Sequence, residues 1–102
     1  MKTELQNDTV RVSAIKELAA ANANAFRDWV CEAMTPNQKN IDIDLSETAL
    51  VDSCGLGTLI SLHRTACSRN GTLRLLNPLP PVKQILQLTR MDHVFEVVDQ
   101  HS

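Results

Sequence analysis

The stretch LVDSCGLGTL, residues 50–59, joins a strand-like segment to a helical one and decides how the chain folds. Two of the chain's three glycines, Gly55 and Gly57, follow Ser53 closely, and Asp52 precedes that serine. Serine and aspartate are favoured at helix N-termini because their side-chain oxygens accept hydrogen bonds from unpaired backbone N–H groups. The stretch therefore predicts a junction that carries a hydroxyl and a carboxylate, with a helix beginning near Leu56.

Upstream of this junction, strand-like and helical periods alternate. Residues 9–15 read TVRVSAI and predict a strand, and residues 1–6 predict a partner strand joined to it by a turn. Residues 19–34 predict a helix that ends before a proline, and residues 40–45, NIDIDL, predict a strand leading into the junction. The positions expected to be buried are Val10, Val12, Ala14, Leu18, Ala25, Phe26, Trp29, Val30, Ala33, Ile41, Ile43 and Leu45.

Downstream, the helical period runs from the junction to the Asn70-Gly71 pair, which suits a left-handed helix end. Residues 72–76, TLRLL, predict a strand, and Pro81 suits the first turn of a third helix. Residues 93–98 predict a last strand. The positions expected to be buried are Leu56, Leu59, Ile60, His63, Cys67, Leu73, Leu75, Val82, Ile85, Leu86 and Thr89.

This alternation predicts an α/β fold, a small mixed sheet of four to five strands with helices packed on it. The length of 102 residues predicts a single domain spanning 1–102. Binding sites in such folds gather at the carboxyl ends of the strands, and the junction lies at such an end. We therefore look for function there.

Composition excludes several classes of function. The net charge of -2 and three aromatic residues disfavour a nucleic-acid surface, which needs a basic face and stacking platforms. No apolar run is long enough to span a membrane, and the polar first ten residues do not resemble a secretion signal. Cys31, Cys54 and Cys67 are odd in number and lack the spacing of metal ligands, which favours a reducing, cytoplasmic location.

The chemistry of Ser53 has four interpretations. A phosphate-binding loop is disfavoured because no lysine follows Gly57. A nucleophile elbow is disfavoured because Val51 takes the place of its first glycine, and no histidine has a favourable position for a catalytic triad. A plain helix cap and a phosphorylation switch both remain open, since a helix N-terminus tolerates added negative charge.

Residues 41–98 resemble the STAS domain of bacterial anti-sigma factor antagonists. The likeness rests on IDLS, on VDSCGLG, on the following amphipathic helix, and on TLRLL with its proline-led helix and VFEV. In that family the serine after the aspartate is phosphorylated by a partner that is both anti-sigma factor and serine kinase. The resemblance implies that Ser53 is this serine, that unphosphorylated protein binds the partner, and that phosphorylation releases it.

The resemblance also implies a regulatory protein that is not an enzyme and has no cofactor or metal. Its expected partners are the anti-sigma factor/kinase and a phosphatase, with no nucleic acid and no membrane insertion, and a monomer is favoured. The alternative is a free-standing STAS subunit of a membrane lipid or solute transport complex, or of a stress-signalling assembly. Cys54 stands where relatives carry Ser or Thr, and we expect it to be a partly buried packing residue. The expected partner-binding residues are Glu17, Asp52, Cys54, Gly55, Leu56 and Gly57.

Overall fold

The computed structural model describes residues 1–99 and shows, within them, a five-stranded mixed sheet. The strand order is β1-β2-β4-β6-β7, with β1 antiparallel to β2 and every other neighbouring pair parallel. This confirms the predicted fold class, including the weakly marked first strand. The strands are β1 (Lys2–Gln6), β2 (Thr9–Ser13), β4 (Asn40–Asp44), β6 (Leu73–Leu76) and β7 (Glu96–Val98).

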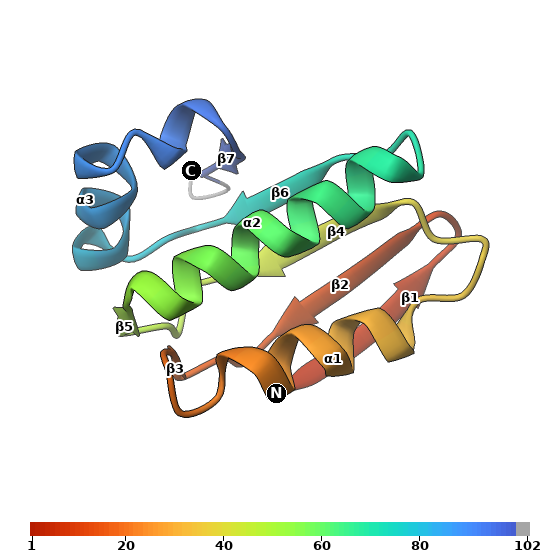
Figure 1. Cartoon of the computed structure of the whole chain (residues 1–102), viewed down its shortest axis with the longest axis horizontal. Helices are drawn as coiled ribbons and strands as arrows, with labels where there is room; N and C mark the ends of the chain where they lie inside the picture. The colour runs from red at the N-terminus through yellow and green to blue at the C-terminus, as the bar shows by residue number, and fades with distance from the viewer. Residues whose placement is uncertain (100–102) are drawn as a thin grey trace.

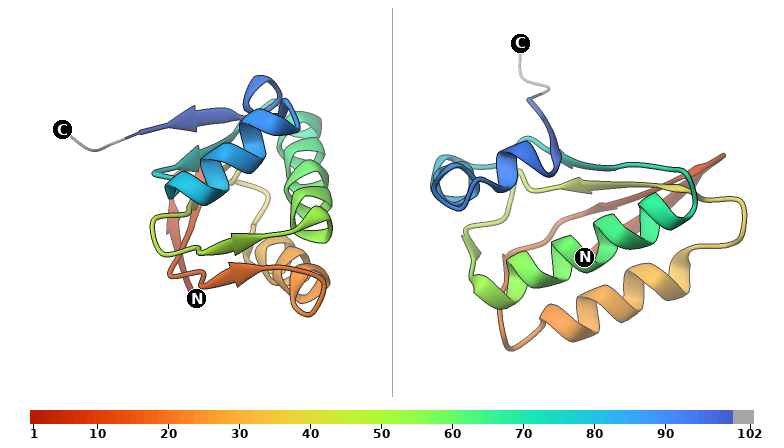
Figure 2. Two further views of the ribbon diagram at one scale, coloured as in Figure 1. Left: turned by 90° about the vertical axis from the view of Figure 1, so that its left-hand side faces the viewer. Right: turned by 45° about the horizontal axis from the view of Figure 1, so that its top comes forward.

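Two helices cover one face of this sheet. They are α1 (Ala23–Ala33) and α2 (Ser53–Ser68), which lie side by side in Figures 1 and 2. The third helix, α3 (Pro80–Leu88), lies beyond the carboxyl end of β6 (Figure 1) and begins with the two prolines of its first turn. A short 3-10 turn, η1 (Met91–His93), leads from α3 toward β7.

A second, two-stranded sheet was not predicted. Strand β3 (Glu17–Leu18) pairs in parallel with β5 (Leu50–Val51). The pairing continues upstream, because the Ala49 N–H donates to the Lys16 carbonyl at 2.9 Å and the Thr48 hydroxyl to the Ile15 carbonyl at 2.6 Å. Two-residue strands are too short to show alternation in a sequence. This small sheet joins the segment before α1 to the segment before α2.

The core lies between the sheet and the two helices that cover it. Most positions expected to be buried are buried. Those that are half-buried include Ala33, Leu56, Ile60, His63 and Ile85, and Ala25 is exposed. Fully buried large side chains include Phe26, Leu18, Ile41, Ile43, Leu45, Leu59, Leu62, Leu73, Leu75 and Leu86.

The predicted helical stripes are wrong in part. Helix α1 begins only at Ala23, and Trp29 is 40% exposed because it lies on the outer side of that helix. In α2 the buried residues are Gly55, Thr58, Leu59, Leu62 and Ala66, and Cys67 is exposed. The buried face of α2 therefore lies about one residue back from the predicted stripe.

Three further expectations fail for local reasons. Ala14 has a φ of 59°, which breaks the alternation of β2, so Ile15 takes the buried position. The last strand begins at Glu96 because η1 occupies the preceding residues. The predicted helical position Thr89 is exposed at the C-cap of α3.

The other face of the sheet carries a row of alternating charges. Glu4, Arg11, Asp42, Arg74 and Glu96 stand directly opposite one another across all five strands. The Arg74 guanidinium donates twice to the Asp42 carboxylate, at 2.9 and 2.6 Å. Cross-strand pairs of opposite charge stabilise a sheet, and each charge in this row stands opposite one of the other sign on the neighbouring strand.

Candidate functional site

The candidate site is the N-terminus of α2, at the carboxyl ends of the parallel strands (Figure 1). The helix begins at Ser53, three residues earlier than the sequence predicts, and Asp52 is its N-cap. The Asp52 Oδ1 accepts the Gly55 N–H at 2.9 Å. The glycines therefore lie inside the helix, and no described glycine has a positive φ. Their role is not to form a flexible loop.

Asp52 also fixes the neighbouring segment. Its Oδ2 accepts the Ala20 N–H at 3.0 Å, and its own N–H donates to the Leu18 carbonyl at 3.2 Å. The hydrogen bonds from Gly55 and then from Ala20 lower the pKa of the Asp52 carboxyl, because they stabilise the ionised form. Both carboxylate oxygens are thus used inside the chain, and Asp52 holds the segment after β3 against the start of α2.

The two glycines differ in what surrounds them. A Cβ atom on Gly55 would lie 2.1 Å from the Leu18 carbonyl oxygen, so this glycine lets α2 approach β3 closely. A Cβ atom on Gly57 would meet nothing within 4 Å. Glycine inside a helix is less favourable than alanine by about 1 kcal/mol. Nothing within residues 1–99 explains that cost at Gly57, which is exposed.

The first turn of α2 presents small groups to solvent. Ser53 and Cys54 are exposed, while Leu56 is half-buried against the core. The expectation that Cys54 is partly buried is therefore wrong, because its position faces away from the sheet. A cleft of about 270 Å³ opens between the starts of α1 and α2, and Asn24, Arg27, Cys54 and Gly57 are among its lining residues.

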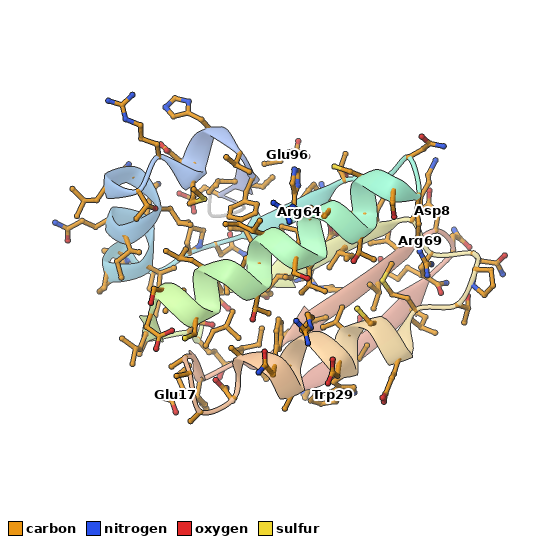
Figure 3. All side chains as sticks on the ribbon, viewed as in Figure 1. Asp8, Glu17, Trp29, Arg64, Arg69 and Glu96 are labelled. Carbon is orange, nitrogen blue, oxygen red and sulfur yellow. The ribbon has the colours of Figure 1, made fainter. Side chains whose placement is uncertain are left out.

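The small second sheet adds two residues to this end of the molecule. Glu17 is exposed and stands opposite Leu50, which is 47% exposed. Figure 3 shows Glu17 at the end where α2 begins, and Arg69 at the opposite end. Leu50 was not among the predicted site residues, although its signal, an apolar residue three positions before Ser53, is present in the sequence. The β3–β5 pairing brings Glu17, Leu50 and Asp52 together.

The histidine of α2 lies apart from Ser53. The ring of His63, farther along α2, contacts Cys67 on the same helix and Phe95 just before β7. No histidine within residues 1–99 hydrogen-bonds Ser53. These residues also contain no group of three potential metal ligands. Ser53 is therefore an exposed hydroxyl at the first position of α2.

Comparison with known proteins identifies the family of this chain. The family model of the STAS domain matches residues 1–102. The chain belongs to the STAS domain family. A proposed anti-sigma factor antagonist of Thermotoga maritima is 29% identical over 97% of this chain and 88% of its own length. Its Thermotoga neapolitana counterpart is 28% identical over the same shares of both chains.

Solved structures show the same fold. A crystal structure of the Thermotoga maritima protein covers 97% of this chain and 86% of its own, with a TM-score of 0.88 and 28% identity. SpoIIAA in its unphosphorylated form covers 99% of this chain and 88% of its own, with a TM-score of 0.84 and 21% identity.

The family of these antagonists is regulatory rather than catalytic. Among the described residues of this STAS domain, no helix is long and apolar enough to cross a membrane.

Proposed function

We propose that this STAS domain is an anti-sigma factor antagonist whose binding is switched by phosphorylation of Ser53. The observation that carries the proposal is an exposed serine at the first position of α2, beside a glycine that the chain's own packing does not require. Unphosphorylated protein binds an anti-sigma factor that is also a serine kinase, and this frees a sigma factor. Phosphorylated protein leaves the partner, and a phosphatase resets it in the cytoplasm.

The surface around Ser53 suits a protein partner. Leu50 supplies exposed apolar area, and Gly57 leaves room for a partner's backbone to approach α2. Glu17 supplies an acidic group on the same edge, opposite Leu50. Binding energy in protein interfaces concentrates in a few well-packed groups near the centre. We assign Leu50 and Leu56 to this central contact, and Glu17, Cys54 and Gly57 to its rim.

Asp52 and Gly55 support the binding surface without contacting the partner. Asp52 uses both carboxylate oxygens on backbone N–H groups, and Gly55 is buried against β3. Their role in binding is to hold Ser53 in position. Loss of either residue would lower affinity by moving the surface, without loss of a direct contact.

Phosphorylation acts mainly on the complex and little on the fold. A phosphate adds about two negative charges, and a helix N-terminus stabilises negative charge through its exposed N–H groups. In the complex the same charge must lose water or meet acidic groups, which costs several kcal/mol. We expect affinity for the partner to fall about 100- to 1,000-fold, equivalent to about 2.7–4 kcal/mol.

Variants of Ser53 test the proposal with the anti-sigma factor captured from the native cell. Ser53→Ala should bind the partner and resist release by ATP, and Ser53→Asp should bind poorly while remaining folded. Ser68→Ala is the control, because Ser68 is an exposed serine near the other end of α2. Mass spectrometry after incubation with kinase and ATP should find phosphate on Ser53. Phosphate on another residue, or tight binding by Ser53→Asp, would refute the switch.

A further inference from the structure

A histidine and a cysteine lie one turn apart near the C-terminal end of α2. The His63 Nε2 and the Cys67 Sγ are 3.6 Å apart. Cys67 is exposed and forms no disulfide. The N-terminus of α2 is the site already described, and this pair lies well away from it. At a rise of 1.5 Å per residue, Cys67 stands about 21 Å along the helix from Ser53.

The separation of the two atoms suits a metal ion between them. Tetrahedral zinc holds histidine nitrogen at about 2.0–2.1 Å and thiolate sulfur at about 2.3 Å, which places the two donors about 3.5 Å apart. The i and i+4 positions of a helix put both side chains on one face. The pair can therefore chelate zinc with little rearrangement of either side chain.

The ring of His63 packs against Phe95 with its Nε2 toward Cys67. The imidazole meets the Phe95 ring edge to face, with centroids 5.7 Å apart and planes at 83°. The Nδ1 atom is buried and has no hydrogen-bond partner within residues 1–99. This leaves Nε2 as the nitrogen that faces Cys67. Metal-bound histidines usually donate their second N–H to a polar group, so we expect weaker binding here than in structural zinc sites.

One chain supplies only half of a zinc site. Structural zinc takes four protein ligands, and residues 1–99 hold no group of three possible ligands. A second copy of the chain would bring the same histidine and cysteine. Two α2 helices crossing at this face would then form a two-fold His₂Cys₂ site, in which each residue meets its own counterpart.

We propose that His63 and Cys67 form half of a zinc site that a second copy completes, so that zinc converts the monomer to a dimer. Each Cys67 thiol loses its proton to solvent when its sulfur binds the metal. The proposal does not depend on the phosphorylation switch, because the dimer contact lies at the other end of α2 and leaves Ser53 accessible.

Titration of the reduced, metal-free protein with cobalt(II) and then zinc(II) tests this. Cobalt should give sulfur-to-metal charge-transfer bands and the visible bands of tetrahedral coordination, which zinc then removes. Binding should saturate at one metal per two chains. Sedimentation should show the mass double with metal and return to that of the monomer with a chelator.

Variants locate the ligands. Cys67→Ser and His63→Gln should each weaken metal binding at least about 100-fold and abolish the dimer. Cys31→Ser is the matched control and should behave as wild type, because Cys31 is an exposed helical cysteine with Arg27 one turn before it. Saturation at one metal per chain without dimerisation would overturn the proposal. So would cobalt bands that persist in Cys67→Ser, which is expected to fold because its side chain is exposed.

Discussion

The Asp52 carboxylate and the two glycines at the start of α2 determine how Ser53 is positioned and how accessible it is. Both carboxylate oxygens of Asp52 accept backbone N–H groups, one from α2 and one from the segment after β3. Gly55 allows the close approach of those two segments, and Gly57 leaves open space. Positioning and accessibility are therefore divided among neighbouring residues of one motif.

The two glycines make a matched pair of variants. Gly55→Ala should destabilise the fold, because the new Cβ would stand 2.1 Å from a backbone oxygen that cannot move alone. Gly57→Ala should raise the free energy of unfolding by up to about 1 kcal/mol, since alanine is the better helix former. Thermal unfolding of both variants measures this. Equal effects of the two substitutions would contradict the assigned packing.

The same pair tests the binding surface. Gly57→Ala should weaken binding of the captured anti-sigma factor, although the domain itself becomes more stable. This opposite change in stability and affinity distinguishes a contact surface from a structural role. Unchanged affinity of Gly57→Ala would remove Gly57 from the interface.

The lowered pKa of Asp52 predicts how stability depends on pH. An unfolded aspartate titrates near pH 3.9, and the folded carboxyl titrates below this value. The ionised group therefore contributes stability above the unfolded pKa, and this contribution disappears as pH falls through the folded pKa. Asp52→Asn has no such titration. Urea unfolding at neutral pH should show a difference in unfolding free energy between wild type and Asp52→Asn, and this difference should narrow in acid. A difference that widens in acid would contradict the stabilising role of the ionised Asp52 carboxylate.

At the scale of elements, the uncovered face of the sheet is organised by its row of opposite charges. Asp42 is buried with its side chain 6% exposed, and Arg74 covers it with two hydrogen bonds. The Asp42 bonds also raise the pKa of Arg74, which stays protonated at every relevant pH. Asp42 alternates with Ile41 and Ile43 in the sequence, but the alternation could not show that Arg74 on a neighbouring strand covers it.

Removal of Arg74 should therefore cost more than removal of an ordinary surface charge. Arg74→Ala leaves a buried carboxylate without its main partner, and we expect a loss of about 1–3 kcal/mol in unfolding free energy. Lys16→Ala is the control, because Lys16 and Glu47 form an exposed ion pair that should contribute less than about 1 kcal/mol. A double-mutant cycle with Asp42→Ala isolates the pair. An Arg74→Ala loss no larger than that of Lys16→Ala would contradict the structural role of the pair.

At the scale of the whole molecule, the sequence predicted what depends on local periodicity. Strands β2, β4 and β6 alternate clearly, and the proline-led start of α3 and the helix end at Asn70 have local signals. The β3–β5 pairing has no local signal in the sequence, because it joins two short segments far apart in the chain. Candidate residues at the junction were found by motif, whereas the different roles of Gly55 and Gly57 depend on which atoms surround them.

The core couples the sheet to the helix that carries the candidate site, and Leu59 tests that coupling. Leu59 is fully buried in the middle of α2, on the side that faces the sheet. Leu59→Ala removes apolar area and leaves a cavity, so we expect a loss of about 2–5 kcal/mol in unfolding free energy. Leu88→Ala is the matched control, because Leu88 is 75% exposed on α3 and its truncation leaves no cavity. Denaturant unfolding should shift to a clearly lower midpoint for Leu59→Ala and hardly move for Leu88→Ala. An unchanged midpoint for Leu59→Ala would mean that α2 does not pack on the sheet through this face.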